Sequence, residues 1–239
     1  MDMSSRTSST RSKVERNASS TGARRTAPSI DVVLLAPSGR RLMVLLVRGP
    51  AKSRERWQLP WRSLRQDETI DDEAAKLARK TLGTAPAMVE QVAAFGDGRR
   101  HPSGSELSVA FLALIDADTG AGFEGDASWF AVDDLPTLPP RQRRMLDGVL
   151  TSLRARLDRG PIAFHMLPFT FTLTQLQDIY ELLLGRRLHK ASFRRSLHAA
   201  WLVEPTDEWR SEGRGRPAQL FRYAPKKKRA GRRGVRFDG

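Results

Sequence analysis

The chain has 239 residues and a mass of 26.8 kDa, which is enough for two small domains. It contains no cysteine, so disulfides, zinc–thiolate sites, iron–sulfur clusters and a cysteine nucleophile are excluded. Its apolar runs are shorter than the roughly 18 residues that a membrane span requires, and its first residues lack the apolar segment of a secretory signal. We therefore expect a soluble, cytoplasmic protein with no membrane partner.

The formal net charge is +14, and it is unevenly distributed. Residues 29–138 hold 13 basic and 16 acidic side chains, whereas residues 139–224 hold 15 basic and 8 acidic ones. This asymmetry favours a polyanion, nucleic acid in particular, as a partner of the second half. Composition alone is equally compatible with an arginine-rich chain whose basic faces are merely solvated.

The first part of the chain is expected to be a mixed α/β sandwich over residues 29–138, after a disordered basic tail at 1–28. Alternating and apolar runs predict strands at 30–36, 42–47, 89–95, 107–115 and 128–132. Between them, helical spacing predicts a helix over 71–82, with Thr69 as its N-cap and Gly83 at its end.

The second part is expected to contain a linker helix and a small DNA-binding fold. Residues 139–168 include a helix at 141–157 and a proline-interrupted apolar connector. A capping-box-like start at Thr172 predicts a helix that stops at Gly185. A second helix at 190–200, a strand at 201–203, a Gly- and Arg-rich turn and a strand at 219–223 complete a winged helix-turn-helix over 169–224. Residues 225–239 form a second disordered basic tail.

The segment from Trp57 to Gly83 resembles the Nudix hydrolase box, G-x5-E-x7-R-E-U-x-E-E-x-G-U, when it is anchored on Glu68 and Gly83. That resemblance implies a Nudix fold. Its catalytic positions differ, as follows: Trp61 and Arg62 replace glycines, Lys76 replaces arginine, and Leu77, Lys80 and Thr81 replace glutamates. Nudix hydrolysis needs carboxylates that hold divalent metals on one helix face. We therefore expect no catalytic residue, no metal and no cofactor here, and the helix by itself reads as an ordinary amphipathic helix.

The loop FGDGRRHP at 95–102 and the strand after it resemble the corresponding stretch of Nudix-related transcriptional regulators, the NrtR family, and of ADP-ribose pyrophosphatases. The resemblance implies a cleft for ADP-ribose, NAD or a related sugar phosphate. The candidate ligand-binding residues are Arg62, Glu68, Arg99 and Arg100. His101 replaces the usual aspartate, and the bulk of Trp61 and Arg62 would narrow that cleft. The alternative for each arginine is a solvated surface loop.

The stretch FTLTQLQDIYELLLGRRLHKASFRRSL, followed by GRPAQLFRY, resembles the C-terminal domain of NrtR-type regulators. A recognition helix carries short polar or basic residues on its outer face, and a basic wing suits phosphates or a minor groove. The candidate DNA-binding residues are Lys190, Ser192, Arg194, Arg195, Arg214 and Arg216. By themselves, Arg194 and Arg195 would read as a solvated basic face.

Three hypotheses follow for the function. The first is a transcriptional regulator, a repressor by resemblance, whose non-catalytic Nudix-like domain senses ADP-ribose or NAD and controls genes of NAD or sugar metabolism. The second is a Nudix hydrolase with an added nucleic-acid module. The third is a DNA-binding protein that uses the Nudix fold only for dimerisation. The resemblance also implies a homodimer, whose two-fold symmetry matches a palindromic operator in double-stranded DNA.

Overall fold

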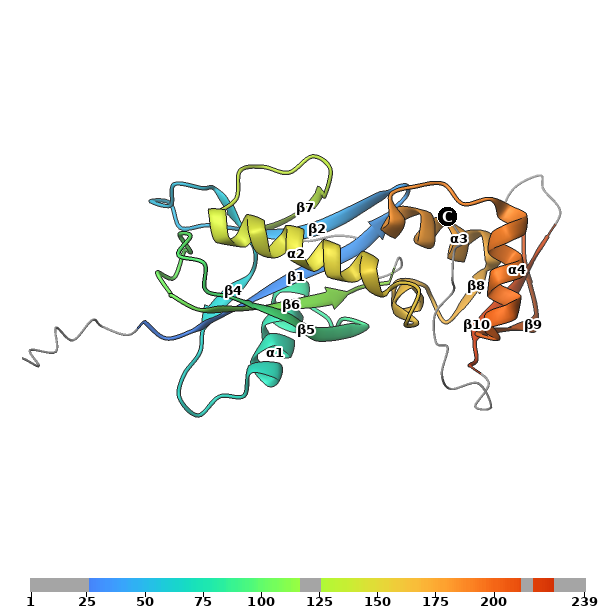
Figure 1. Ribbon diagram of the computed structural model, residues 1–239, viewed down its shortest axis with the longest axis horizontal. Coiled ribbons are helices and arrows are strands. Elements are labelled where there is room, and N and C mark those ends of the chain that lie inside the picture. The colour runs from blue at the N-terminus through green and yellow to red at the C-terminus, as the bar shows by residue number, and fades with distance from the viewer. Residues whose placement is uncertain (1–25, 117–125, 212–216, 226–239) are drawn as a thin grey trace, which may run out of the picture.

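The structure, a computed structural model, describes residues 26–116, 126–211 and 217–225. Its first part is built on a mixed seven-stranded sheet (Figure 1). The strands are β1 (Ser29–Ser38), β2 (Arg41–Arg48), β3 (Trp57–Gln58), β4 (Trp61–Ser63), β5 (Met88–Phe95), β6 (Ser108–Leu114) and β7 (Ala127–Ala131). Their order is β3-β2-β1-β6-β5, with β4 on β1 and β7 on β2. Strands β1 and β6 are parallel, and the other pairs are antiparallel.

Two helices cover opposite faces of this sheet. Val33 and Leu35 of β1 pack in one core with α2 (Pro140–Arg156), whereas Val32 and Leu34 pack in a second core with α1 (Ile70–Leu82). Successive side chains of a strand point to opposite faces, so a strand covered on both faces is apolar throughout. The expected α/β/α sandwich is therefore confirmed.

The second part is a winged helix, as expected. It consists of β8 (Thr170–Thr172), α3 (Leu173–Leu184), α4 (Lys190–Ala200), β9 (Val203–Arg210) and β10 (Ala218–Tyr223). The three strands form a sheet in the order β8-β10-β9. Tyr180 of α3 and Phe193 of α4 hold the two helices together, with ring centroids 5.6 Å apart.

A buried joint connects the two parts. The connector folds into a short 3-10 helix, η1 (Ile162–Met166), in which Ala163 and Met166 are fully buried. Its side chains belong to the same apolar core as Leu153 of α2 and Leu176 of α3. The winged helix is consequently packed against the sandwich rather than tethered to it.

The expected strand at 201–203 is wrong. Trp201 is the C-cap of α4 in the left-handed conformation, with φ of 51°, and β9 begins only at Val203. That strand continues to Arg210, through residues expected to form a turn. An aromatic and a β-branched residue favour a strand locally, but the end of α4 decided the conformation of Trp201. The short strands β3, β4 and β8 escaped prediction because long-range pairing alone defines them.

Within the described ranges, the structure contains no helix that is both long and apolar enough to cross a bilayer.

Candidate functional sites

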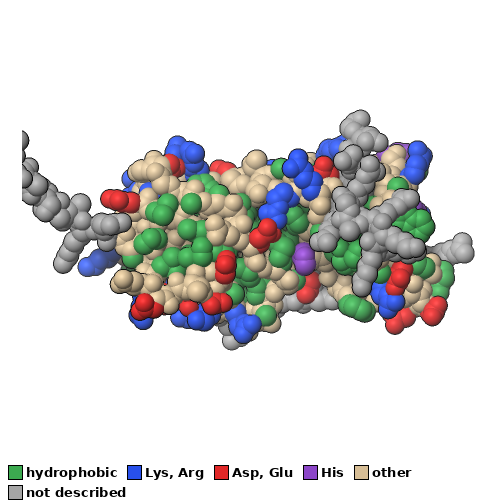
Figure 2. Space-filling view, turned by 60° about the horizontal axis from the view of Figure 1, so that its bottom comes forward, with side chains coloured by type: hydrophobic (Ala, Val, Ile, Leu, Met, Phe, Trp, Pro, Cys, Tyr) green, Lys and Arg blue, Asp and Glu red, His purple; other side chains and the backbone are tan. Residues whose placement is uncertain are grey.

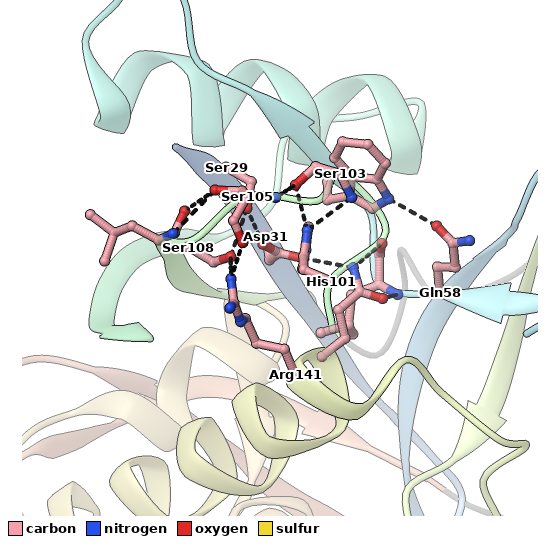
Figure 3. A network of polar contacts seen from close by, with 12 residues as sticks. Ser29, Asp31, Gln58, His101, Ser103, Ser105, Ser108 and Arg141 are labelled. Carbon is pink, nitrogen blue, oxygen red and sulfur yellow. Dashed lines mark hydrogen bonds and ion pairs between the residues drawn. The ribbon is translucent and has the colours of Figure 1, made fainter. Parts of the chain in front are cut away.

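A fully buried aspartate lies at the centre of the polar network in Figure 3. Asp31 on β1 accepts hydrogen bonds from Nε2 of His101 at 2.9 Å and from Nε2 of Gln142 on α2 at 2.7 Å. The backbone N–H of Ser103 donates to Nδ1 of His101 at 3.1 Å, which places the ring proton on Nε2, toward Asp31. Because the imidazole has no exposed surface, the network holds the loop that contains His101 onto β1 and α2.

Asp97 anchors the same loop from its other end. Its carboxylate accepts a hydrogen bond from Nη1 of Arg99 at 2.7 Å, and Nε of Arg144 on α2 lies 3.2 Å away. Burial raises the pKa of Asp97, but the hydrogen bonds from Arg99 and the charge of Arg144 outweigh it, so the pKa lies below its ordinary value. Arg99 and Arg100 are left about half exposed on this anchored loop, with Arg100 paired to the buried Glu55.

Arg62 and Glu68 bind each other. Nη2 of Arg62 donates to the two carboxylate oxygens of Glu68 at 2.7 and 2.9 Å, while Nη1 contacts the buried Glu73 of α1. Lys76 also donates to Glu73, at 2.7 Å. The backbone N–H of Arg65, then the guanidinium of Arg62, lower the pKa of Glu68 against the opposing effect of burial. Arginine and lysine thus neutralise the two carboxylates near this end of α1.

The four candidate ligand-binding residues lie in two groups rather than one. Arg62 on β4 pairs with Ile30 of β1, whose side chain belongs to the core beneath α1. Trp61, the preceding residue, pairs with Asp31, and its ring contacts His101 at a centroid distance of 5.4 Å. Since opposed residues of paired strands share a face, Arg62 and Glu68 lie on the α1 side. Arg99 and Arg100 lie on the loop tied to α2.

Leu77, Lys80 and Thr81, which the Nudix resemblance aligns with glutamates, carry no carboxylate. Of the residues there, Lys80 is exposed, and the hydroxyl of Thr81 donates to the carbonyl of Leu77 at 2.9 Å within the helix. Across the described ranges, no group of three or more His, Cys, Asp and Glu side chains is arranged to hold a metal ion.

The outer face of α4 is basic. Lys190, Ser192, Arg194 and Arg195 are all exposed, while Phe193 and Leu197 are buried against α3. In the part of the chain that the structure describes, no carboxylate lies within ion-pair distance of Lys190, Arg194 or Arg195. Three exposed cationic side chains without a carboxylate partner are suited to bind an external polyanion.

Elsewhere, arginines are mostly neutralised by nearby carboxylates. Figure 2 shows basic and acidic side chains interspersed over the face that it presents. Arg41 pairs with Asp133 at 2.7 Å, and Arg143 pairs with Asp147 at 3.1 Å. The unpaired face of α4 therefore differs from most of the arginine-bearing surface.

The two candidate wing residues, Arg214 and Arg216, lie outside the described residues. The strands that flank them are well anchored, because the hydroxyl of Thr206 on β9 donates to the carbonyl of Leu220 on β10 at 3.1 Å. Arg222 on β10 also pairs with Glu204 on β9.

Sequence reasoning missed Asp31, Arg141 and Gln142. Asp31 had a usable signal, because it is the single charge in the apolar run of β1, and a buried charge needs partners. The sequence carried no comparable signal for Arg141 and Gln142, because the polar residues at the start of a helix are ordinarily exposed to solvent. In the structure both are buried, and Gln142 accepts from the N–H of Leu59 at 3.0 Å.

Comparison with known proteins gives matches to both parts. Residues 163–223 match the family model of the NrtR DNA-binding winged helix domain. The ADPR responsive transcriptional repressor NtrR of Acinetobacter baylyi is 28% identical over 204 residues, which cover 82% of this chain and 81% of that protein. The NAD-capped RNA hydrolase NudC of Deinococcus radiodurans is 29% identical over 136 residues, which cover 54% of this chain and 47% of that protein.

Among solved structures, the crystal structure of Shewanella oneidensis NrtR complexed with a 27mer DNA superposes with a TM-score of 0.73 at 26% identity. The match covers 87% of this chain and 97% of that one. A match of this extent spans both the sandwich and the winged helix of this chain.

Proposed function

We propose that the protein is a transcriptional repressor of the NrtR type. Residues 163–223 match the family model of the NrtR DNA-binding winged helix domain, and the chain superposes on NrtR over most of its length. The protein binds a palindromic operator as a homodimer, and an ADP-ribose-like metabolite in its Nudix-like domain controls that binding. The similarity to an ADPR responsive repressor supports the effector class. The genes controlled would be those of NAD or sugar metabolism.

The observation that carries this proposal is the basic outer face of α4. Arg194 and Arg195 project from a helix whose opposite side is locked to α3 by Phe193 and Leu197. A rigid helix can hold a guanidinium in bidentate contact with a guanine edge, which is worth roughly 1–3 kcal/mol of discrimination. We propose that α4 reads the bases, with Lys190 and Ser192 on phosphates, and that Arg214 and Arg216 anchor the backbone.

The DNA-binding proposal is tested with an operator selected from a random duplex library. We expect Arg194→Ala or Arg195→Ala to weaken operator binding at least tenfold, while binding to a scrambled duplex falls much less. Arg216→Ala should weaken both about equally and reduce the salt dependence by roughly one ion. Arg79→Ala, an exposed arginine on α1, is the matched control. An unchanged operator-to-scrambled ratio in both α4 variants would show that this helix is not the reader.

For the effector, we propose that Arg99 and Arg100 contact its phosphates, because they stand about half exposed on a loop fixed at both ends. Arg62 and Glu68 contribute differently, as an ion pair that braces the start of α1 on the other side of the sheet. Titration with ADP-ribose should raise the melting temperature of the wild type and of Arg79→Gln. The same titration should leave Arg99→Gln and Arg100→Gln nearly unchanged. No shift in the wild type would favour a Nudix fold that serves only for dimerisation.

A second candidate function is hydrolysis, which the similarity to the hydrolase NudC favours. We propose instead that the Nudix-like domain is not catalytic, because Leu77, Lys80 and Thr81 provide no metal-binding carboxylate. Glu68 is already engaged by Arg62. Incubation with ADP-ribose and Mg²⁺ or Mn²⁺ should release no AMP. Turnover that EDTA abolishes and Glu68→Gln removes would establish the hydrolase.

A further inference from the structure

A cleft of about 640 Å³ lies where the sandwich meets the winged helix. Its walls come from the turn between β1 and β2, from α2, and from the end of α3, and Figure 1 shows that hairpin reaching toward α3. Leu42, Leu150 and Leu182 form its apolar wall. The volume falls within the usual range of small-molecule sites, roughly 300–1,000 Å³.

The same tripeptide, Gly-Arg-Arg, enters the cleft from each part of the protein. One copy is residues 39–41, in the β1–β2 turn, and the other is residues 185–187, directly after α3. Gly39 has φ of 56° and Gly185 has φ of 68°, a left-handed conformation that other residues adopt only with strain. The first arginine of each copy therefore follows a sharp, sequence-encoded turn.

Each copy contains one paired and one unpaired arginine. The second arginine forms an ion pair in both cases, Arg41 with Asp133 at 2.7 Å and Arg187 with Glu181 at 2.8 Å. Arg40 and Arg186, by contrast, have no ion pair or side-chain hydrogen bond to any residue in the described ranges. Two guanidiniums, one from each domain, are left available to a ligand.

Carboxylates line the cleft from both parts: Asp133 and Asp147 are paired with Arg41 and Arg143, and Asp178 and Glu181 lie on α3. Burial, then the charge of Glu181, raise the pKa of Asp178, while the charge of Arg40 acts in the opposite direction. Arg40 is thus within electrostatic reach of the other domain. Arg154 of α2 braces this junction, since its Nε donates to the carbonyl of Leu183 at 3.1 Å.

We propose that this cleft is a second effector site, which binds a nucleoside di- or triphosphate and bridges the two domains. Arg40 and Arg186 hold the phosphate chain from opposite domains, because guanidinium groups match phosphate oxygens in charge and geometry. The apolar wall of Leu42, Leu150 and Leu182 accommodates the base, and Asp178 accepts hydrogen bonds from a hydroxyl or amino group. The bound ligand then fixes the orientation of the winged helix relative to the sandwich.

This site differs from the ADP-ribose site proposed above in residues and in location. Arg99 and Arg100 do not line the cleft, and none of the α4 candidates does. The cleft and its arginines are separate from α4, so the nucleotide site does not depend on DNA binding by that helix.

The test is isothermal titration of the full-length chain with ADP, ATP, adenosine and inorganic pyrophosphate. We expect ATP and ADP to bind, pyrophosphate to bind more weakly, and adenosine not to bind. Arg40→Gln and Arg186→Gln should each weaken ATP binding about tenfold or more with little change in melting temperature, because neither side chain forms an ion pair or a side-chain hydrogen bond with any described residue. Arg79→Gln is the matched control.

Two further measurements separate this site from its alternatives. Arg100→Gln should retain ATP binding, whereas loss of ATP binding in that variant alone would assign the nucleotide to the Nudix-like cleft and overturn the proposal. Duplex DNA affinity is measured in parallel. If Arg40→Gln and Arg186→Gln weaken DNA binding and the wild type binds no ATP, the cleft contacts a DNA backbone and the nucleotide site is refuted.

Discussion

Arginines of similar sequence context have different roles in this protein, and the presence of a carboxylate within reach separates them. Arg99 and Arg100 are a pair in a loop, and each has an acidic partner. Arg194 and Arg195 are a pair on a helix, and neither has a partner in the described part of the chain. An arginine already paired must exchange one partner for another to bind a ligand, whereas an unpaired one gives up only water.

The buried Asp31 is expected to matter for stability. Asp31→Ala removes the acceptor of His101 and of Gln142, so two buried N–H groups lose their partner. We expect the free energy of unfolding to fall by about 2–5 kcal/mol. Urea unfolding measures it, with Asp67→Ala, at an exposed loop position, as the control. A loss of less than about 1 kcal/mol would mean that water replaces the carboxylate.

At the scale of elements, α1 and α3 both begin after a threonine N-cap, but the hydrogen bonds that this threonine makes to the first turn differ. Thr172 accepts a hydrogen bond from the N–H of Gln175 at 3.1 Å, and Gln175 accepts from the N–H of Thr172 at 2.8 Å, which completes a capping box before α3. Thr69, at the N-cap of α1, makes no such bond, and its hydroxyl donates to Asp72 instead. Threonine thus caps α3 with a side-chain hydrogen bond, whereas at α1 it occupies the N-cap position without making that bond.

This difference predicts unequal effects of the same substitution. Thr172→Ala should destabilise the protein by about 1 kcal/mol, because the partly buried N–H of Gln175 in α3 loses its acceptor. Thr69→Ala should lower the free energy of unfolding by clearly less. Thermal unfolding monitored by circular dichroism compares the two variants directly. Equal shifts in melting temperature would show that the capping box contributes nothing beyond the position of the residue.

At the scale of the whole molecule, the two parts share one apolar core. Leu153 of α2, Met166 of η1 and Leu176 of α3 belong to the same cluster. A shared core couples the orientation of α4 to the sandwich, since packed interfaces shift between discrete arrangements rather than deform continuously. An effector bound to the sandwich can thereby alter the placement of α4, the helix that we propose to read DNA.

Charge predicts a separate role for the two ends of the chain. Residues 1–28 and 225–239 hold 13 basic and 3 acidic side chains, all of which lie outside the described residues. Deleting both ends should weaken binding to every duplex and flatten its salt dependence, because fewer counterions are released. Preference for the operator should persist. Fluorescence anisotropy at several salt concentrations tests this, and loss of preference with the ends would move the readout away from α4.

Much of the fold and part of the site could be predicted from local patterns. The periodicity of 71–82 and 190–200 located α1 and α4 to within one residue, because one face of each helix is apolar and the other is not. That same periodicity placed Arg194 and Arg195 on the outside of α4, opposite Phe193. Helix ends followed from residues next to them in the chain, such as Thr172 and Gly185.

Tertiary structure alone decided which charged groups meet. Gln142 bonds to Asp31, which lies 111 residues away, and Arg100 pairs with Glu55, 45 residues away. Periodicity is a property of neighbours in the chain, whereas an ion pair depends on the distance between elements that folding brings together. For this reason the sequence by itself indicated a basic reading helix. It could not indicate that Arg62 and Arg100 lie on different sides of a sheet, or that Arg40 and Arg186 share a cleft.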